Sequence, residues 1–212
     1  MIHYLIDASV VVDFYRPRSS FRAQVFSRHV ALKDHITNQR LSGKAIIFIP
    51  AFCVAEVFNT FEKWWIRQKA VFQSQRHYED ARQLFISHVH DRRFFYCYDL
   101  TRYRNLNCHE VFPVEHTTQT EFQVRGLPTT ASWADLNRKL QEIDPRDTVG
   151  RHHLSAFDIL IIAMGMELQA IHGERVYLLT KDARLALVAG QKAKFPKPLY
   201  WPNLSVSDLP AR

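Results

Sequence analysis

Short apolar runs of strand length alternate with longer segments of helical periodicity along most of the chain. We expect strands over 2–7, 45–49, 93–98, 176–180 and 199–204. Helices are expected over 10–14, 51–69, 75–91, 154–172 and 183–188. Strands that alternate with helices form parallel sheets with helices on both faces. The alternation therefore predicts an α/β fold with three α/β/α layers around a central parallel sheet.

The segment 100–150 does not follow this alternation. It is polar and is interrupted by Pro113, Pro128 and Pro145. Residues 106–155 hold five Lys/Arg and seven Asp/Glu, a net charge of −2. Because the whole chain carries +7, the remaining residues carry +9. We expect a single domain over 1–212 with an insertion at about 100–150, and we expect the basic character to belong to the α/β framework.

The balance of 28 Lys+Arg against 21 Asp+Glu favours a polyanionic partner such as nucleic acid or anionic lipid. No apolar run approaches the ~20 residues of a membrane span, and the amino-terminal segment lacks the basic leader of a signal peptide. None of the six glycines forms a GxGxxG or GxxxxGK[ST] motif, so dinucleotide and P-loop phosphate sites are excluded. Three scattered cysteines form neither a disulfide framework nor a CxxC motif, which predicts a cytoplasmic protein.

Four acidic residues lie in apolar surroundings. Asp7 ends the first predicted strand, and Glu56 interrupts the apolar segment 48–61. Asp158 lies inside an apolar helix, and Asp182 follows the strand at 176–180. Acidic side chains are almost never fully buried without a partner. These four residues are therefore the candidates for a functional site.

The predicted fold brings the four acids toward one edge, because sites in open parallel sheets form at the carboxyl ends of the strands. Two carboxylates ~4 Å apart would repel by about 4 kcal/mol at an effective dielectric constant near 20. Raised pKa values or a bound divalent cation would relieve this repulsion. Oxygen ligands without His or Cys at a matching spacing favour Mg²⁺ or Mn²⁺. Such a cation can activate water and stabilise charge on a phosphodiester, so the acids and the basic framework together predict a nuclease.

Each acid also has a structural interpretation. Ser155 and Asp158 match a capping box, and Asp182 would cap the following short helix. Asp7 would cap the first helix or form a turn, and Glu56 would be an acid favoured by the dipole of the first helical turn. For each residue taken alone, the structural interpretation stays open. That all four acids have only structural roles is a weaker explanation than a shared site.

The same residues resemble the PIN-domain nucleases, and the VapC-like toxin ribonucleases of toxin–antitoxin systems are the most similar subgroup. The resemblance covers about 1–60 and 150–205. It rests on Tyr4-Leu-Ile-Asp7-Ala-Ser9, on Glu56 after Pro50, on Phe157-Asp158-Ile-Leu-Ile-Ile-Ala-Met164, and on Leu178-Leu-Thr180-Lys-Asp182. It implies a Rossmann-like fold, an Mg²⁺ or Mn²⁺ cofactor and the hydrolysis of RNA.

By position, the resemblance implies that Asp7 and Asp158 are the main metal ligands. Glu56 and Asp182 would act directly or through metal-bound water, and Ser9 and Thr180 would hydrogen-bond the water shell or the carboxylates. A toxin role would add an antitoxin protein as a partner and a homodimer as the assembly. The segment 100–150 matches no part of the family.

Basic residues near the predicted site are candidates for holding RNA phosphates: Arg16, Arg18, Arg22, Arg151, Lys181 and Arg184. Trp64 and Trp65 would either stack on bases or pack in the core or a dimer. The alternative function is a catalytically silent RNA-binding or scaffold protein of the same fold. A small-molecule phosphatase is disfavoured because the first strand is followed by Asp7-Ala-Ser9 and not by a DxD pair.

Overall fold

The computed structural model describes residues 1–17, 23–67, 71–90, 94–99 and 155–211. The predicted insertion and three of the predicted phosphate-binding residues, Arg18, Arg22 and Arg151, lie outside the described residues. The chain divides into two compact units, the first comprising 1–99 with 205–212 and the second 100–204. The prediction of one domain with an insertion stays a prediction.

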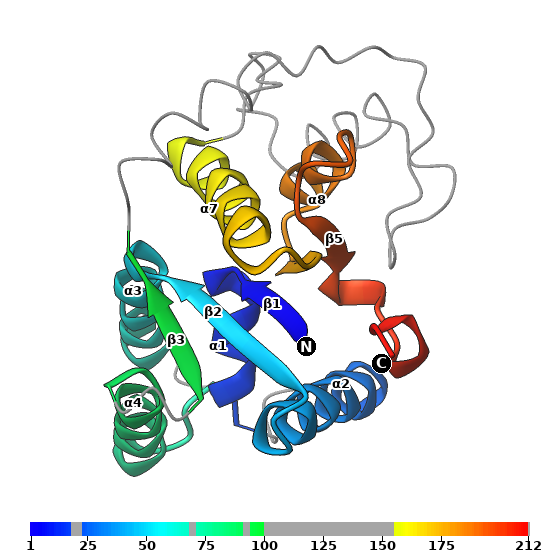
Figure 1. The fold of residues 1–212 in the computed structure, drawn as a ribbon. Coiled ribbons are helices and arrows are strands. Elements are labelled where there is room, and N and C mark those ends of the chain that lie inside the picture. Colours follow the sequence, from blue (N-terminus) through cyan, green and yellow to red (C-terminus); the bar gives the residue numbers. More distant parts are fainter. Residues whose placement is uncertain (18–22, 68–70, 91–93, 100–154, 212) are drawn as a thin grey trace, which may run out of the picture. The chain divides into compact units, whose positions relative to one another are not determined.

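The first unit contains three parallel strands in the order β3-β2-β1 (Figure 1). These strands are β1 (Ile2–Ile6), β2 (Ala45–Pro50) and β3 (Phe95–Tyr98). The helices between them are α1 (Ala8–Tyr15), α2 (Ala23–Leu41), α3 (Ala51–Arg67) and α4 (Gln75–His90). The unit closes with a short 3₁₀ turn, η3 (Val206–Asp208), which packs against α2.

Helices α1 and α3 begin directly at the carboxyl ends of their strands. All five residues of β1 are buried, and α1 starts after the single residue Asp7. Helix α3 starts at Ala51, immediately after Pro50 ends β2. Side chains in the first turns of these two helices therefore lie at the carboxyl edge of the sheet, and α1 packs against α3.

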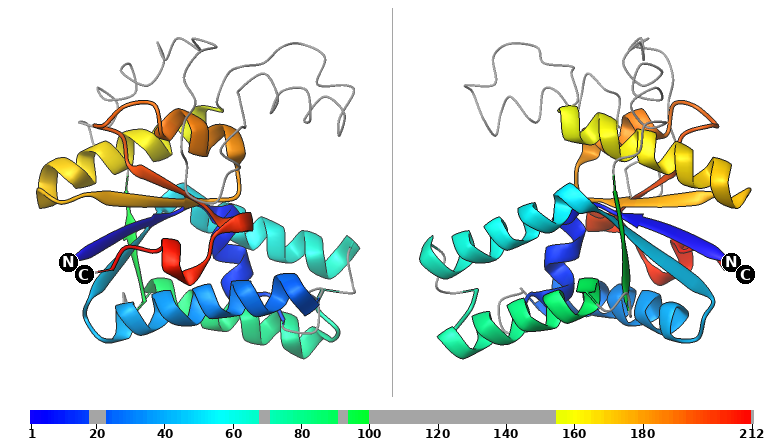
Figure 2. Two further views of the ribbon diagram at one scale, coloured as in Figure 1. Left: turned by 90° about the vertical axis from the view of Figure 1, so that its right-hand side faces the viewer. Right: turned by 60° about the vertical axis from the view of Figure 1, so that its left-hand side comes forward.

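Helices α3 and α4 run side by side (Figure 2). Aromatic rings fill the space between them and α1. Phe61 and Phe85 lie 6.0 Å apart between ring centroids, and both rings contact Tyr15 edge-on. These rings are buried, and edge-to-face pairs of this kind stabilise a core beyond the area they bury. The aromatic cluster thus fixes α1, whose amino end carries Asp7.

The second unit contains the parallel strands β4 (Val176–Thr180) and β5 (Lys197–Tyr200) with helices α7 (Ala156–His172) and α8 (Ala183–Ala189). Helix α7 ends at Gly173, whose φ of 64° suits glycine and whose N–H donates to the Gln169 carbonyl. Both helices pack on β4 and lie on the same side of it (Figure 2). The 3₁₀ turn η2 (Trp201–Asn203) follows β5.

The predicted α/β class is confirmed, with parallel strands covered by helices as in a three-layer α/β/α fold. Two elements differ from the expectation by more than two residues or in their existence. Helix α2 was not predicted, because its sequence is polar on most faces. Strand β5 covers 197–200 and not 199–204, because the chain turns into η2 at Trp201 and Pro202 has no N–H for a strand ladder. Within the described residues, no helix has the length and apolar character that crossing a bilayer requires.

Candidate functional site

Asp7 is a buried carboxylate at the carboxyl end of β1. Its backbone carbonyl accepts hydrogen bonds from the N–H groups of Val10 and Val11 at 3.0 and 3.1 Å and so begins α1. Its side chain makes no capping hydrogen bond to α1 and is only 8% exposed. The Ser9 hydroxyl instead donates to Oδ2 of Asp7 at 2.5 Å. The capping interpretation therefore does not explain why a carboxylate occupies this position.

Asp7, Cys53 and Glu56 form a cluster that we call the Asp7 centre. Their ligand atoms, one from each side chain, all lie within 4.8 Å of one another. Cys53 and Glu56 are the third and sixth residues of α3, a spacing that places both on the face of the helix toward Asp7. Cys53 is buried and Glu56 is exposed. The centre thus has one deep acid, one deep thiol and one acid that reaches solvent.

The interpretation of Glu56 as a first-turn acid is wrong. The first turn of α3 contains no acidic residue, and Glu56 lies in the second turn. The interaction with the helix dipole falls off within the first turn. Glu56 is therefore better explained by its proximity to Asp7 than by its place in the helix.

Cys53 is the member of the centre that sequence analysis missed. Cys53 is not part of a CxxC motif, so the sequence offers only one indication that it belongs to a site. That signal is its position three residues before Glu56, on a helix that starts directly at the end of a strand. A cysteine at this spacing shares a helix face with the acid, which is enough to place it at the same edge of the sheet.

The electrostatics of the Asp7 centre favour a cation. Two ionised carboxylates within 4.8 Å of each other repel by about 3 kcal/mol at an effective dielectric constant near 20. Carboxylate oxygens suit Mg²⁺ and Mn²⁺, whereas a thiolate suits softer metals. Asp7 and Glu56 therefore fit a hard divalent cation, and the sulfur of Cys53 makes Mn²⁺ a better match than Mg²⁺.

Asp158 completes a capping box in the second unit. Its Oδ2 accepts hydrogen bonds from the N–H of Ser155 at 2.9 Å and from the Ser155 hydroxyl at 2.6 Å. The Asp158 N–H in turn donates to the Ser155 hydroxyl oxygen at 3.2 Å. The capping box predicted for this pair is confirmed. Asp158 thus has a structural role at the amino end of α7, whatever else its half-buried carboxylate does.

Asp182 is the N-cap of α8. Its Oδ1 accepts hydrogen bonds from the N–H groups of Arg184 and Leu185 at 2.7 and 3.0 Å, so the predicted capping role is confirmed. The buried Thr180 hydroxyl oxygen accepts from the Asp182 N–H at 2.9 Å. Burial, and secondarily the negative charge of Asp182, raise the pKa of Tyr200 at the end of β5. The Asp182 carboxylate therefore faces the carboxyl end of the β4–β5 pair.

The structure brings Asp7 and Glu56 together in the first unit, whereas Asp158 and Asp182 belong to the second unit. The prediction that all four acids share one site stays a prediction. Among the predicted phosphate-binding residues, Lys181 and Arg184 flank Asp182 in the sequence and are half-buried.

Arg16, Trp64 and Trp65 make ring contacts within the first unit. The Arg16 guanidinium lies over the Trp64 ring at 5.5 Å. The Trp64 ring also contacts Phe61. Trp65 stacks on Tyr78 with ring centroids 5.5 Å apart and an interplanar angle of 14°. These contacts fit the packing interpretation of the tryptophan pair and engage Arg16 within the first unit.

Comparison with known proteins finds no match to this chain. The chain matches no protein-family model, no curated protein and no solved structure. The resemblance to PIN-domain nucleases therefore rests on the four short motifs of the sequence, and the assignment of a function rests on the chemistry of the residues.

Proposed function

We propose that the protein is a metal-dependent endoribonuclease that hydrolyses RNA phosphodiester bonds. The observation that carries the proposal is the Asp7 centre. Asp7 is 8% exposed, its side chain does not cap α1, and its carboxylate lies within 4.8 Å of a second acid. Such a carboxylate is what binding of a divalent cation requires.

In this proposal, Asp7 and Glu56 hold Mg²⁺ or Mn²⁺ through their oxygens. The hydrogen bond from Ser9 fixes the orientation of the Asp7 carboxylate and so limits the entropy lost when a cation binds. Asp158 and Asp182 are further predicted ligands, each held in one orientation by its helix-capping hydrogen bonds. Thr180 holds the Asp182 backbone in place.

The bound cation would supply an activated water and neutralise the charge that develops on the phosphodiester. The residues of the chain would then bind and orient the substrate. In this proposal Glu56, the acid of the centre that reaches solvent, or Asp182 orients the attacking water. The net charge of +7 favours a nucleic-acid substrate, because phosphate contacts dominate the affinity of such complexes. RNA is the nucleic acid that the resemblance to PIN-domain nucleases implies.

The cellular setting follows the same proposal. We propose a cytoplasmic enzyme, because RNA is the substrate and the cysteines suggest a reducing compartment. An antitoxin protein and a homodimer belong to the toxin role that the sequence motifs imply. Both would be tested by purifying the protein together with the product of a neighbouring gene.

Cleavage of a labelled pool of single-stranded RNA tests the activity. We expect cleavage with Mg²⁺ or Mn²⁺ and none with EDTA. Asp7→Asn should lower the rate by about a hundredfold or more, because losing a metal ligand removes several kcal/mol of transition-state stabilisation. Asp80→Asn is the matched control, because Asp80 lies on α4 with its side chain 69% exposed. Equal cleavage by the native protein and Asp7→Asn, or cleavage that persists in EDTA, would contradict the proposal.

One observation favours the alternative of a silent RNA-binding or scaffold protein. Asp158 and Asp182 each satisfy backbone N–H groups at a helix start, so a protein without activity would still have a reason to keep them. The alternative predicts RNA binding that is the same with Mg²⁺ and with EDTA, without cleavage in either. Fluorescence anisotropy of a labelled RNA, recorded beside the cleavage assay, separates the two functions.

A further inference from the structure

Strands β4 and β5 end side by side at the carboxyl edge of the second unit. Their parallel register pairs Thr180 with Tyr200, and the side chains of paired residues project to the same face of a sheet. The Thr180 hydroxyl oxygen accepts a hydrogen bond from the Asp182 N–H at 2.9 Å. Tyr200 therefore projects to the face of the strand pair on which Asp182 lies.

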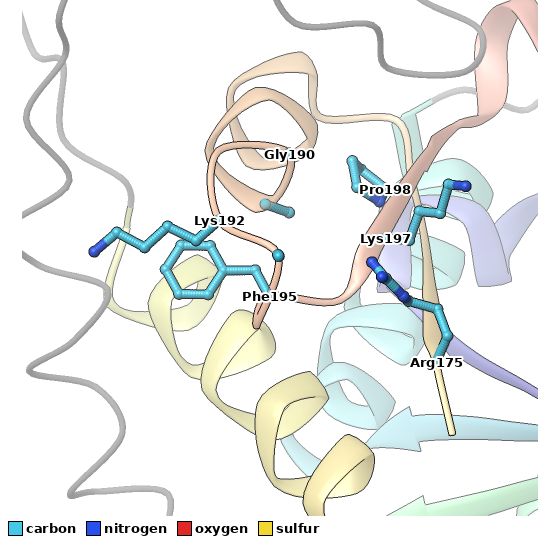
Figure 3. Close-up of a pocket in the computed structure, with 8 residues that line it drawn as sticks. Arg175, Gly190, Lys192, Phe195, Lys197 and Pro198 are labelled. Atoms are coloured by element: carbon cyan, nitrogen blue, oxygen red, sulfur yellow. The ribbon is translucent and has the colours of Figure 1, made fainter. Parts of the chain in front are cut away.

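The amino ends of the same strands do not gather polar groups in this way. Arg175 and Lys197 contribute there to a pocket of about 180 Å³. Figure 3 shows the ammonium groups of Lys192 and Lys197 directed away from this pocket, so the cations do not converge on one ligand. In the second unit, the carboxyl edge is therefore the better candidate for contact with a substrate.

The Asp182 carboxylate and the Tyr200 phenol are complementary groups at this edge. Oδ1 of Asp182 accepts both capping hydrogen bonds, from the N–H groups of Arg184 and Leu185, so Oδ2 is left outside the cap. Within the described part of the chain, neither this Oδ2 nor the Tyr200 hydroxyl makes a hydrogen bond. Asp182 is exposed and Tyr200 is half-buried. The edge thus presents one acceptor and one hydroxyl to a ligand.

The Tyr200 hydroxyl acts as a hydrogen-bond donor at neutral pH. Burial, and secondarily the negative charge of Asp182, raise the pKa of the phenol from its ordinary value of 10.0. The phenol therefore keeps its proton, whereas an ionised carboxylate only accepts hydrogen bonds. The influence of the Asp182 charge on Tyr200 also agrees with the proximity that the strand register indicates.

A ligand for this pair has to accept a hydrogen bond from the phenol and donate one to the carboxylate. A hydroxyl group does both with a single oxygen. A phosphate oxygen fits less well, because its negative charge is repelled by the Asp182 carboxylate. In a nucleic acid, the group with the required chemistry is the ribose 2′-hydroxyl, which is present in RNA and absent from DNA.

We propose that Tyr200 and Oδ2 of Asp182 together bind a ribose 2′-hydroxyl and so select RNA over DNA. The Tyr200 hydroxyl donates to the ribose oxygen, and the ribose hydroxyl donates to Oδ2 of Asp182. The proposal rests on the proposed function for its substrate and names the residue that distinguishes RNA from DNA. Each carboxylate oxygen has two acceptor positions, so this contact leaves Asp182 able to fill the other roles proposed for it.

Packing of the Tyr200 ring is the competing explanation. Tyrosine commonly buries its ring and leaves its hydroxyl in water. A packing role needs the ring and not the hydroxyl, and it is indifferent to the sugar of a bound nucleic acid. Tyr200→Phe, which keeps the ring, therefore separates the two explanations.

Fluorescence anisotropy of two labelled oligonucleotides in EDTA tests the proposal in the intact protein without cleavage. One is single-stranded RNA, and the other is DNA of the same sequence with deoxyuridine in place of thymidine, so the two differ only in the 2′-hydroxyl. We expect the native protein to bind the RNA more tightly. Tyr200→Phe should weaken RNA binding by about three- to tenfold, the range expected for one lost hydrogen bond, and leave DNA binding unchanged within about twofold.

Tyr177→Phe is the matched control. It removes the same hydroxyl from a half-buried tyrosine of β4, three residues before Thr180 and opposite Lys197. We expect Tyr177→Phe to retain the native preference for RNA. Melting temperatures of both variants establish that they are folded.

The proposal is overturned if the native protein binds RNA no more tightly than DNA, or if Tyr200→Phe retains the native preference. It is also overturned if Tyr177→Phe loses as much of the preference as Tyr200→Phe. Cleavage assays on the same proteins keep these outcomes apart from the proposed function. RNA cleavage together with an unchanged preference in Tyr200→Phe contradicts the role of Tyr200 alone, whereas a preference that depends on Tyr200 without any cleavage contradicts the nuclease activity alone.

Discussion

At the scale of single residues, the sequence indicates Asp7 and Glu56 more strongly than Cys53. The two acids interrupt apolar segments, and this conflict between charge and burial is visible in the sequence. A cysteine in an apolar segment creates no such conflict, because free cysteine is itself among the most buried residue types. Only the helix spacing, read after the strand end was known, places Cys53 at the Asp7 centre.

The four acids also differ in whether they cap a helix. The capping box at Ser155 and the cap at Asp182 were open interpretations of the sequence, and both are present. Capping motifs can be predicted because they depend on residues three positions apart in the chain. The absence of a cap by the Asp7 side chain depends on tertiary surroundings, so the sequence could not distinguish Asp7 from a capping residue.

His88 should make stability depend on pH. Burial, and secondarily the charge of Lys33, lower its pKa from 6.5, and its Nδ1 lies 2.8 Å from the Tyr15 hydroxyl. The unfolded chain then takes up a proton at higher pH than the folded protein does. The free energy of unfolding should therefore have its full value above pH 6.5 and fall as the pH drops below it.

His88→Gln should flatten this dependence between about pH 7 and pH 5. Urea unfolding at a series of pH values measures this pH dependence of the free energy of unfolding. His77→Gln is the control, because His77 is exposed on the same helix. An unchanged slope for His88→Gln would contradict the assignment of the dependence to His88.

At the scale of elements, most strands and helices could be predicted from local pattern. The strand at 176–180 has the predicted bounds, and α3 and α4 begin where expected. Helix α2 escaped prediction because its sequence is largely polar, although Leu32 and Ile36 are fully buried. An apolar stripe this narrow is difficult to distinguish from a polar loop.

Gly165 shows a close approach between elements that the sequence does not reveal. A Cβ at this position of α7 would lie 2.5 Å from Cγ and 2.7 Å from Cβ of Pro196. Gly165→Ala would gain about 1 kcal/mol of helix propensity but should lose more through overpacking, for a net destabilisation of about 1–2 kcal/mol. Chemical denaturation measures the change.

A double-mutant cycle with Pro196→Gly provides the control for Gly165→Ala. Removing the proline ring should make Gly165→Ala neutral or stabilising, because the clash is gone and only the helix propensity remains. If Gly165→Ala is equally destabilising with and without the Pro196 ring, the close contact is not the cause.

At the scale of the whole molecule, the sequence indicated the α/β class and the concentration of charge. The net charge of +9 outside 106–155 includes Lys181 and Arg184, which flank Asp182 in the sequence. The sequence does not reveal that Arg175 and Lys197 line one pocket, because this follows from the parallel pairing of β4 with β5, in which Tyr177 opposes Lys197. Pairing between separate strands is a tertiary property that no local pattern encodes.

Binding of Mn²⁺ is the most direct test of the central claim that Asp7 and Glu56 form a divalent-cation site. Electron paramagnetic resonance of free Mn²⁺ during a titration measures this binding without RNA or activity. We expect the native protein and Asp80→Asn to bind Mn²⁺ alike, and both Asp7→Asn and Glu56→Gln to bind it at least about tenfold more weakly, the size of effect expected for loss of a ligand. Equal Mn²⁺ affinity in all four proteins, or no binding by the native protein, would contradict the claim.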